Sequence, residues 1–172
     1  MEAQTHGVLV EVLGVGILLL GPSGIGKSEC ALELVARGHR LVADDVVRLR
    51  RAGDRVLGSA PEPIRHFTEI RGIGLLYVPA LYGPDAVRDE AAVEVLVRLE
   101  RWREGADYER VGLERGREAL LGVELSSLLL PVRPATSMAT LLEVVARDHR
   151  SRRRGENAVE RLERVGERAG ER

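Results

Sequence analysis

The chain has 172 residues and a formal net charge of −1, so it fits one domain with a full core and has no general attraction to nucleic acid or anionic membranes. Its apolar runs are too short to cross a bilayer, and it lacks the basic start, apolar stretch and small-residue cleavage site of a secretion signal. The single cysteine, Cys30, cannot form an internal disulfide, which suits a reducing compartment. We therefore expect a cytoplasmic protein with neither a membrane nor a nucleic-acid partner.

The N-terminal part of the chain predicts two strands and a helix. Residues 8–13 (VLVEVL) and 16–20 (GILLL) are short apolar runs, and the segment 14–16 (GVG) favours a hairpin turn between them. In residues 28–37 the apolar side chains recur at helical spacing, and Gly38 is placed to cap that helix. Residues 41–49 (LVADDVVRL) then predict a strand that contains two acids.

The rest of the chain continues the alternation of strands and helices, which indicates an α/β domain over residues 1–150. A charged helix within residues 151–172 is expected to pack on the same domain or on a neighbouring subunit. The predicted elements are a Gly-Asp hairpin at 53–54, strands at 73–78, within 87–102 and at 123–130, the last stopped by Pro131 and Pro134, and helices at 138–150 and 158–168.

The clearest motif is a phosphate-binding loop between the second predicted strand and the first helix. Its glycines allow the backbone N–H groups to turn inward at a helix N-terminus, Lys27 reaches the outer phosphates, and the Ser28 hydroxyl can bind Mg²⁺. The alternative is a glycine-rich turn with a stray lysine, but the strand before and the helix after it favour a bound polyphosphate such as ATP or pyrophosphate. The loop, which satisfies G-x-x-x-x-G-K-[ST], consists of Gly21, Pro22, Ser23, Gly24, Ile25, Gly26, Lys27 and Ser28.

The composition singles out the same lysine. Of the 26 basic residues, Lys27 is the one that is not an arginine. An ammonium group is a compact point charge, whereas a planar guanidinium is a poor replacement where a loop closes tightly around a phosphate.

Two adjacent acids, Asp44 and Asp45, follow the phosphate loop by one helix. Neighbouring residues of a strand face opposite sides, so only one of the two can point at the phosphates. A structural salt bridge to one of the many arginines is an alternative, because an acid in a buried strand needs a cation or a donor. Next to a phosphate loop, we favour a carboxylate that accepts a hydroxyl proton or holds Mg²⁺ through water.

Five segments, in the same order, resemble the catalytic domain of the HPr kinase/phosphorylase family, bacterial enzymes that act on a serine of the phosphocarrier protein HPr. The resemblance extends from His6 to about Ala158 and implies a single P-loop kinase domain with a mixed sheet, similar to the HPr kinase and PEP carboxykinase-like fold. Members usually carry a further N-terminal domain, and the resemblance here begins at the catalytic one. The segments read HGVLVEVLGVGILLLGPSGIGKSE, RGHRLVADDVV, EIRGIGLLYV (close to the family signature), DYERVGL and LPVRPATSMATLLEVVARDHRSRRRGENA.

The resemblance assigns roles to particular residues. It implies that Asp44 is the catalytic acid/base, with Asp45 secondary, and that Glu69 shares Mg²⁺ with Ser28. It also places His6 in the active site, near the phosphate or the metal, although a histidine so near a terminus is otherwise more often exposed.

The same comparison adds two arginines and a turn. Arg110 matches the active-site arginine of the family, which suits the charge of a transferring phosphoryl group. Arg71, with Gly72 and Gly74, continues the EIRGIG segment, which from the residues alone indicates a turn.

The resemblance implies an ATP- and Mg²⁺-dependent kinase of HPr that also catalyses the reverse phosphorolysis of phosphoserine-HPr to pyrophosphate. It also implies a homo-oligomer, which the family suggests is a hexamer. In the family, PVRP is typically followed by a glycine and a basic residue, but here Ala135 and Thr136 follow Arg133 and Pro134. Losing the glycine restricts the backbone, and losing the basic side chain removes a positive charge near incoming phosphate. We therefore expect weak phosphorolysis relative to the kinase direction, although Arg133 remains and could compensate.

Two alternatives from other classes stay open. A small-molecule kinase on the same scaffold, for example one acting on free serine, would share Lys27, Asp44 and Glu69. A nucleotide-binding regulator without turnover is the second, and the intact set of predicted catalytic residues argues against it, because a pure binder does not need a base.

Overall fold

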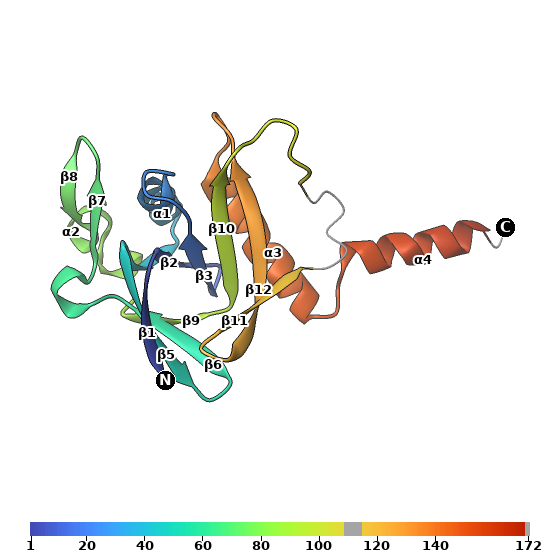
Figure 1. Cartoon of the computed structure of the whole chain (residues 1–172), viewed down its shortest axis with the longest axis horizontal. Helices are drawn as coiled ribbons and strands as arrows, with labels where there is room; N and C mark the ends of the chain where they lie inside the picture. The colour runs from blue at the N-terminus through green and yellow to red at the C-terminus, as the bar shows by residue number, and fades with distance from the viewer. Residues whose placement is uncertain (109–114, 171–172) are drawn as a thin grey trace.

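The structure is a computed structural model that describes residues 1–108 and 115–170. Helices, a six-stranded mixed sheet and a four-stranded antiparallel sheet form successive layers, and the long helix α4 projects away from them (Figure 1). In chain order the elements are β1 (Glu2–His6), β2 (Val8–Val12), β3 (Val15–Leu20), α1 (Lys27–Ala36), β4 (Arg40–Ala43), β5 (Val46–Ala52), β6 (Arg55–Ser59), β7 (Phe67–Ile70), β8 (Gly74–Tyr77), α2 (Val78–Tyr82), β9 (Glu90–Val93), β10 (Val95–Arg101), β11 (Gly116–Leu120), β12 (Val123–Val132), α3 (Met138–Arg153) and α4 (Ala158–Gly170), with short 3₁₀ turns at Glu62–Ile64 and Pro84–Ala86.

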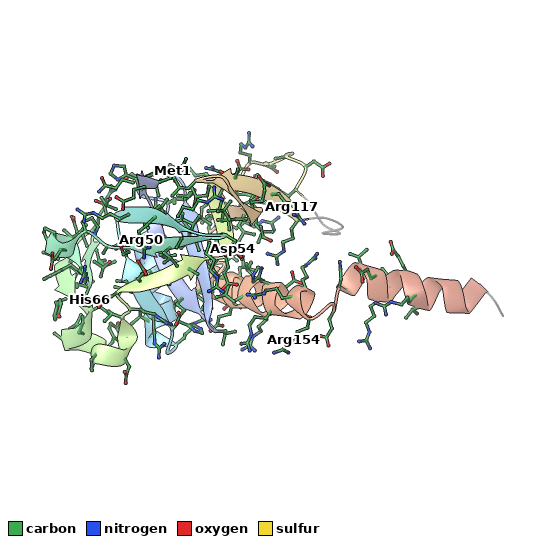
Figure 2. The ribbon with its side chains drawn as sticks, turned by 90° about the horizontal axis from the view of Figure 1, so that it is seen from below. Met1, Arg50, Asp54, His66, Arg117 and Arg154 are labelled. Carbon is green, nitrogen blue, oxygen red and sulfur yellow. The ribbon has the colours of Figure 1, made fainter. Side chains whose placement is uncertain are left out.

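The six-stranded sheet positions the site. Its strand order is β11-β12-β10-β3-β2-β4, and β3, β10 and β12 are parallel, whereas β2, β4 and β11 are antiparallel to their neighbours. The carboxyl ends of the three parallel strands therefore meet at one edge of the sheet (Figure 1). The second sheet has the order β1-β5-β6-β9, and β7 pairs with β8 in a separate hairpin. Figure 2 shows this second sheet from its outer side, with Arg50 on β5 and Asp54 at the turn into β6.

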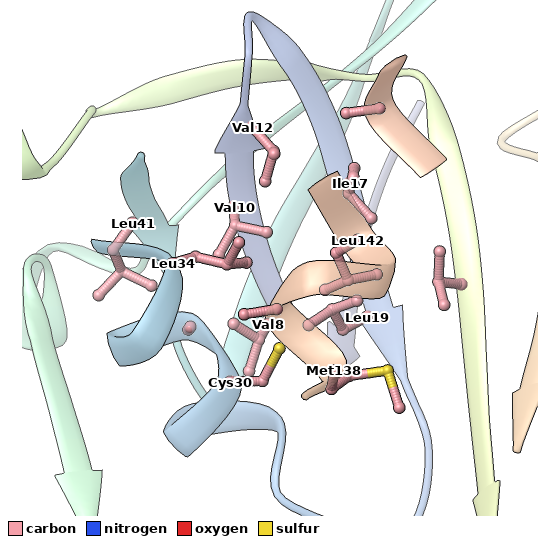
Figure 3. Packing of buried hydrophobic residues seen from close by; sticks show 14 of the residues in the cluster. Val8, Val10, Val12, Ile17, Leu19, Cys30, Leu34, Leu41, Met138 and Leu142 are labelled. Carbon is pink, nitrogen blue, oxygen red and sulfur yellow. The ribbon is translucent and has the colours of Figure 1, made fainter. Parts of the chain in front are cut away.

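Both faces of the central strands are buried. On one face Val8, Val10 and Leu19 pack against Leu34 of α1 and Leu142 of α3 (Figure 3). The residues between them, such as Leu9 and Leu18, face the four-stranded sheet in a second core. Strands buried on both faces need nearly continuous apolar runs, which is why β2 and β3 are aliphatic except at Glu11 and Gly16.

The α/β class with a mixed sheet is confirmed, and so are the first hairpin and the helix after it. The turn of that hairpin lies at Leu13 and Gly14, both with positive φ (52° and 79°), one residue before the predicted position. The predicted helices at 138–150 and 158–168 are also present, as α3 and α4. Among the described residues, no helix is long and apolar enough to cross a membrane.

Two predicted single strands are wrong, because in each case the chain changes sheet in the middle of the apolar run. Residues 41–49 form β4 in the six-stranded sheet and β5 in the four-stranded one, with a bend at Asp44 and Asp45. Residues 87–102 likewise form β9 and β10, with the break at Glu94. Periodicity within one run does not reveal which partner strand each half meets.

The predicted end of β12 is also wrong. The strand continues through Pro131 to Val132 and pairs there with the end of β10. Its other neighbour, β11, pairs with it only as far as Ser127, so Pro131 interrupts no ladder on that side within the described residues. Proline is tolerated at such a strand edge.

A charged cluster joins α1 to α3. The Glu143 carboxylate of α3 accepts a hydrogen bond from Arg37 Nη1 (3.1 Å), and its Oε1 lies 2.7 Å from His39 Nε2. His39 is buried, with 9% exposure, although histidines in loops usually lie at the surface. The hydrogen bond from His39 lowers the pKa of Glu143, burial opposes this, and Arg37 lowers it further. The contribution of this carboxylate to stability is therefore present above its ordinary pKa and lost as the pH falls through the lowered value.

We predict that Glu143→Gln lowers the free energy of unfolding by about 1–2 kcal/mol at pH 7, since it removes the charge that Arg37 and His39 share. Below about pH 4.5, the ordinary pKa of this carboxyl, the difference between the variant and the parent should shrink and then vanish as Glu143 of the parent becomes protonated. Urea unfolding between pH 7 and pH 3 measures both. The control is Glu33→Gln, which removes a more exposed partner of Arg37. If the free energy of unfolding of Glu143→Gln were lower than that of the parent by the same amount at every pH, the prediction would be contradicted.

Candidate active site

The predicted phosphate loop joins the carboxyl end of β3 to the amino end of α1. Gly24 and Gly26 have φ of 77° and 101°, values that favour glycine, and Gly26 occupies the position just before the helix. Gly21 lies against β10, where an added Cβ would be 2.7 Å from the carbonyl oxygen of Leu99. The glycines of the pattern are therefore required by the backbone itself, and the first turn of α1 points its N–H groups at the loop.

The remaining loop residues anchor and close it. Ile25 is buried at 8% exposure and holds the loop to the core, while Pro22 and Ser23 are exposed. The Lys27 ammonium donates hydrogen bonds to the carbonyl oxygens of Gly21 (2.8 Å) and Pro22 (3.0 Å). The one lysine of the chain thus lies over the loop, where its charge can meet the outer phosphates of a ligand.

Asp44 faces this loop and is almost fully buried, with 6% exposure. Its Oδ1 accepts hydrogen bonds from the Ser28 hydroxyl (2.8 Å) and from the backbone N–H of Asp45 (2.9 Å), and its Oδ2 accepts one from the Thr68 hydroxyl. Three donors on one carboxylate satisfy the hydrogen-bonding needs of a side chain that is out of contact with water.

Asp45 lies at a bend in the chain rather than within a continuing strand. Its φ is 65°, in the left-handed region, and its side chain is 81% exposed. His6 Nδ1 lies 3.7 Å from Asp45 Oδ1 and is itself 87% exposed. Of the two acids, Asp44 is the one whose side chain accepts a hydrogen bond from Ser28, and the reason is a bend between two sheets and not the alternation of one strand.

A pocket of about 510 Å³ collects most of the predicted site residues. The hairpin of β7 and β8 supplies its wall opposite the loop: Arg71 Nη2 lies 3.4 Å from Ser23 Oγ, and its guanidinium lies above Gly24, where a Cβ would be 3.3 Å from Nη1. Lining residues include the loop glycines, His6, Lys27, Ser28, Asp44, Asp45, Glu69 and Arg71.

The structure does not place four other predicted residues in this pocket. Gly72 and Gly74 form the turn of the β7–β8 hairpin, with φ of 88° and 106°, as the residues alone suggested. Arg133 does not line this pocket; its guanidinium carbon lies 3.4 Å from the ring centroid of Trp102. Arg110 lies outside the described residues.

Sequence reasoning missed Thr68. This residue is 3% exposed and binds Asp44 from the strand that also carries Glu69. A threonine in a strand is common, and nothing local indicates that its hydroxyl meets an acid far away in the chain. Its contact ties the β7–β8 hairpin to the phosphate loop through Asp44.

The donor set suits a hard cation. The Ser28 hydroxyl and the Asp44 carboxylate are adjacent, Glu69 lines the same pocket, and all three offer oxygen. No group of three or more His, Cys, Asp or Glu residues that could enclose a metal occurs in the described part of the chain. Mg²⁺ fits such a site, because it takes few protein ligands and keeps waters and substrate phosphate oxygens.

The one cysteine does not contribute chemistry. Cys30 is buried within α1, and burial, helped by Glu33 and opposed by Arg37, raises the pKa of its thiol to about 12. A thiol in that state is not a nucleophile at neutral pH.

Comparisons with known proteins show what the chain is similar to. The family model described as HPr Serine kinase C-terminal domain matches residues 1–165. The chain is 53% identical over 162 residues to the HPr kinase/phosphorylase of Caldanaerobacter subterraneus subsp. tengcongensis and 48% identical over 158 residues to that of Bacillus subtilis. These matches cover 94% and 91% of this chain, which spans about half the length of either relative (53% and 51%). The structure of the Hpr(Ser) kinase/phosphatase from Coxiella burnetii superposes with a TM-score of 0.82 at 32% identity, over 89% of this chain and 93% of the other.

We predict that Lys27→Ala weakens the binding of both ATP and pyrophosphate by at least about tenfold, because it removes a charge-assisted contact to the outer phosphates. Isothermal titration calorimetry in the presence of Mg²⁺ measures the affinity for both ligands. Lys27→Arg keeps the charge but not the compact ammonium and should restore binding only in part. Unchanged affinities of a folded Lys27→Ala variant would contradict the assignment of the loop.

Proposed function

The chain belongs to the HPr serine kinase C-terminal domain family, and from this premise we propose that it is an ATP-dependent protein kinase that phosphorylates a serine of the phosphocarrier protein HPr. The observation that carries the proposal is the buried Asp44 carboxylate beside the phosphate loop, held by Ser28 and Thr68. This arrangement supports a base that is fixed next to the phosphoryl group to be transferred.

In the forward reaction, the acceptor serine attacks the γ-phosphorus while Asp44 takes its proton. The new bond joins the serine Oγ to phosphorus, and the bond from phosphorus to the bridging oxygen of ADP breaks. Lys27 offsets the charge on the outer phosphates, and Arg71 on the opposite wall is placed to contact the acceptor or the phosphates. Mg²⁺, held by Ser28 and Glu69, would neutralise charge on the β- and γ-phosphates.

In the reverse reaction, an oxygen of inorganic phosphate attacks the phosphorus of phosphoserine, and the bond from that phosphorus to the serine Oγ breaks. The products are pyrophosphate and serine, and Asp44 takes a proton from the attacking phosphate and returns it to the serine Oγ. We propose that this direction is weak. Ala135 has φ of 62°, a backbone conformation that favours glycine and costs an alanine about 1 kcal/mol. The loop that carries Arg133 is therefore strained where the family has a glycine, and Thr136 offers no charge to incoming phosphate.

One feature favours a protein over a small-molecule acceptor. The β7–β8 hairpin beside the pocket exposes Ile73 (71%), Leu75 (68%) and Tyr77 (44%). Clustered apolar side chains at the surface next to a site mark a macromolecular contact, which free serine would not need. A cytoplasmic homo-oligomer, a hexamer as the family suggests, is part of the same proposal, with α4 free to meet a neighbouring subunit.

The decisive experiment incubates the chain with ATP, Mg²⁺ and either HPr or free serine, and follows phosphate transfer. We expect transfer to HPr, and a drop in kcat of about a thousandfold for Asp44→Asn, which keeps the shape but loses the proton acceptor. ATP should still bind this variant. Asp45→Asn, at the exposed neighbour, is the matched control and should stay within about threefold of the parent.

Each other outcome has a clear meaning. Transfer to free serine alone would replace the protein kinase with a small-molecule kinase. Binding of ATP without transfer to either acceptor would indicate a regulator. An inactive Asp45→Asn beside an active Asp44→Asn would reverse the assignment of the two acids.

We further predict that the rate of pyrophosphate release from phosphoserine-HPr and phosphate is lower than the forward rate. The double substitution Ala135→Gly and Thr136→Lys should raise the reverse rate, because it relieves the φ of 62° and restores a cation. Forward transfer by the double variant is the control. Comparable rates in the two directions for the unmodified chain would show that this loop is not limiting.

A further inference from the structure

A second pocket, of about 390 Å³, lies away from the phosphate loop and is built around a stack of three side chains. The Trp102 ring is stacked with the Tyr108 ring at 4.8 Å between centroids, and the Arg133 guanidinium lies 3.4 Å from the Trp102 centroid. The chain has five aromatic residues of the Phe, Trp and Tyr types (one Phe, one Trp and three Tyr), and two of them are in this stack. Pro131, Thr136 and Leu141 complete much of the lining.

The stack lies at the same sheet edge as the phosphate loop. Trp102 directly follows β10 and Arg133 directly follows β12, and the Trp102 backbone N–H donates to the Val132 carbonyl (3.2 Å). Both strands are parallel to β3, which ends at the loop, and β10 is its immediate neighbour (Figure 1). With strands about 4.8 Å apart and about 3.3 Å per residue, the stack is on the order of 10 Å from the loop. The base of a nucleoside triphosphate extends about that far from its outer phosphates.

The chemistry of the stack suits a flat, polar ring. The Arg133 guanidinium carbon lies 3.4 Å from the centroid of the Trp102 ring, and the residue is exposed, so the guanidinium is open to a ligand on the side away from Trp102. Arginine planes and aromatic rings are the groups on which nucleobases stack, and guanidinium N–H groups can donate to ring nitrogens. Trp102 holds the guanidinium in place, so little side-chain entropy is lost when a base binds.

We propose that the pocket of Trp102, Tyr108 and Arg133 is the subsite for the purine base of the nucleotide, with the base stacked on the open face of Arg133. The inference rests on the proposed function, because the base belongs to the ATP whose phosphates occupy the loop at Lys27. Arg133 then recognises the nucleoside, and its effect on the phosphates is secondary.

The test compares a ligand that has a base with one that lacks it. Isothermal titration calorimetry measures the affinity for ATP and for inorganic tripolyphosphate, each with Mg²⁺. The proteins compared are the unmodified chain, Arg133→Ala and Arg133→Lys. We expect both variants to bind ATP about tenfold more weakly and tripolyphosphate with unchanged affinity, because lysine keeps the charge but not the stacking plane. Arg154→Ala, at the end of α3 (Figure 2), removes the same charge elsewhere and should change neither ligand.

Three results would overturn the proposal. If Arg133→Ala weakens ATP and tripolyphosphate equally and Arg133→Lys restores both, the residue acts only by its charge. If neither variant changes ATP binding, the base does not lie here. If ATP and tripolyphosphate bind the unmodified chain equally well, the base has no subsite. The binding measurements contain no acceptor protein, so they test the base subsite even if the chain has no kinase activity. Weaker binding of both ATP and tripolyphosphate by Lys27→Ala tests the phosphate loop separately.

Discussion

The buried carboxylate of Asp44 is the constraint on which the site depends. An ionised acid at 6% exposure is unfavourable unless donors surround it, and here the donors come from Ser28 of α1, from the bend at Asp45 and from Thr68 of β7. Satisfying one charge therefore brings the phosphate loop, the crossing between two sheets and the β7–β8 hairpin to one point. Removing any of these donors would leave part of the carboxylate unpaired, which costs more than the hydrogen bond itself.

Acids occupy two of the places where the chain changes sheet; at a third, between β1 and β2, the residue is Gly7. Asp44 lies between β4 and β5, and Glu94 lies between β9 and β10. At the second crossing Glu94 lies 3.2 Å from His149 Nε2 and accepts a hydrogen bond from Arg153 (2.6 Å). The hydrogen bond from His149 lowers the pKa of Glu94, burial opposes it, and Arg153 adds to the lowering. Because a crossing breaks the ladder on both sides, its backbone and side chains must find other partners, and a carboxylate offers several acceptor sites.

Neighbouring parallel strands end in loops that suit different parts of one nucleotide. The loop after β3 is suited to phosphates, since glycines, a helix N-terminus and Lys27 converge there. The segments after β10 and β12 carry aromatic and guanidinium planes instead. In open α/β sheets, ligands bind outside the carboxyl ends of the strands, and here neighbouring ends differ in chemistry within one such edge.

Features that depend on neighbours in the chain could be predicted from the sequence. The spacing of Gly21, Gly26, Lys27 and Ser28, an apolar run before them and a helical pattern after them were enough to predict the loop, because every part of it is local. Only the folded chain shows where two apolar runs break, and that Thr68 and Trp102 contact a site residue each. Each of these depends on contacts between distant segments: Asp44 meets Thr68, and Trp102 meets Arg133, only after strands have been assigned to one sheet or the other. That assignment is made by packing on two faces at once, and an apolar run looks the same whichever face it will bury.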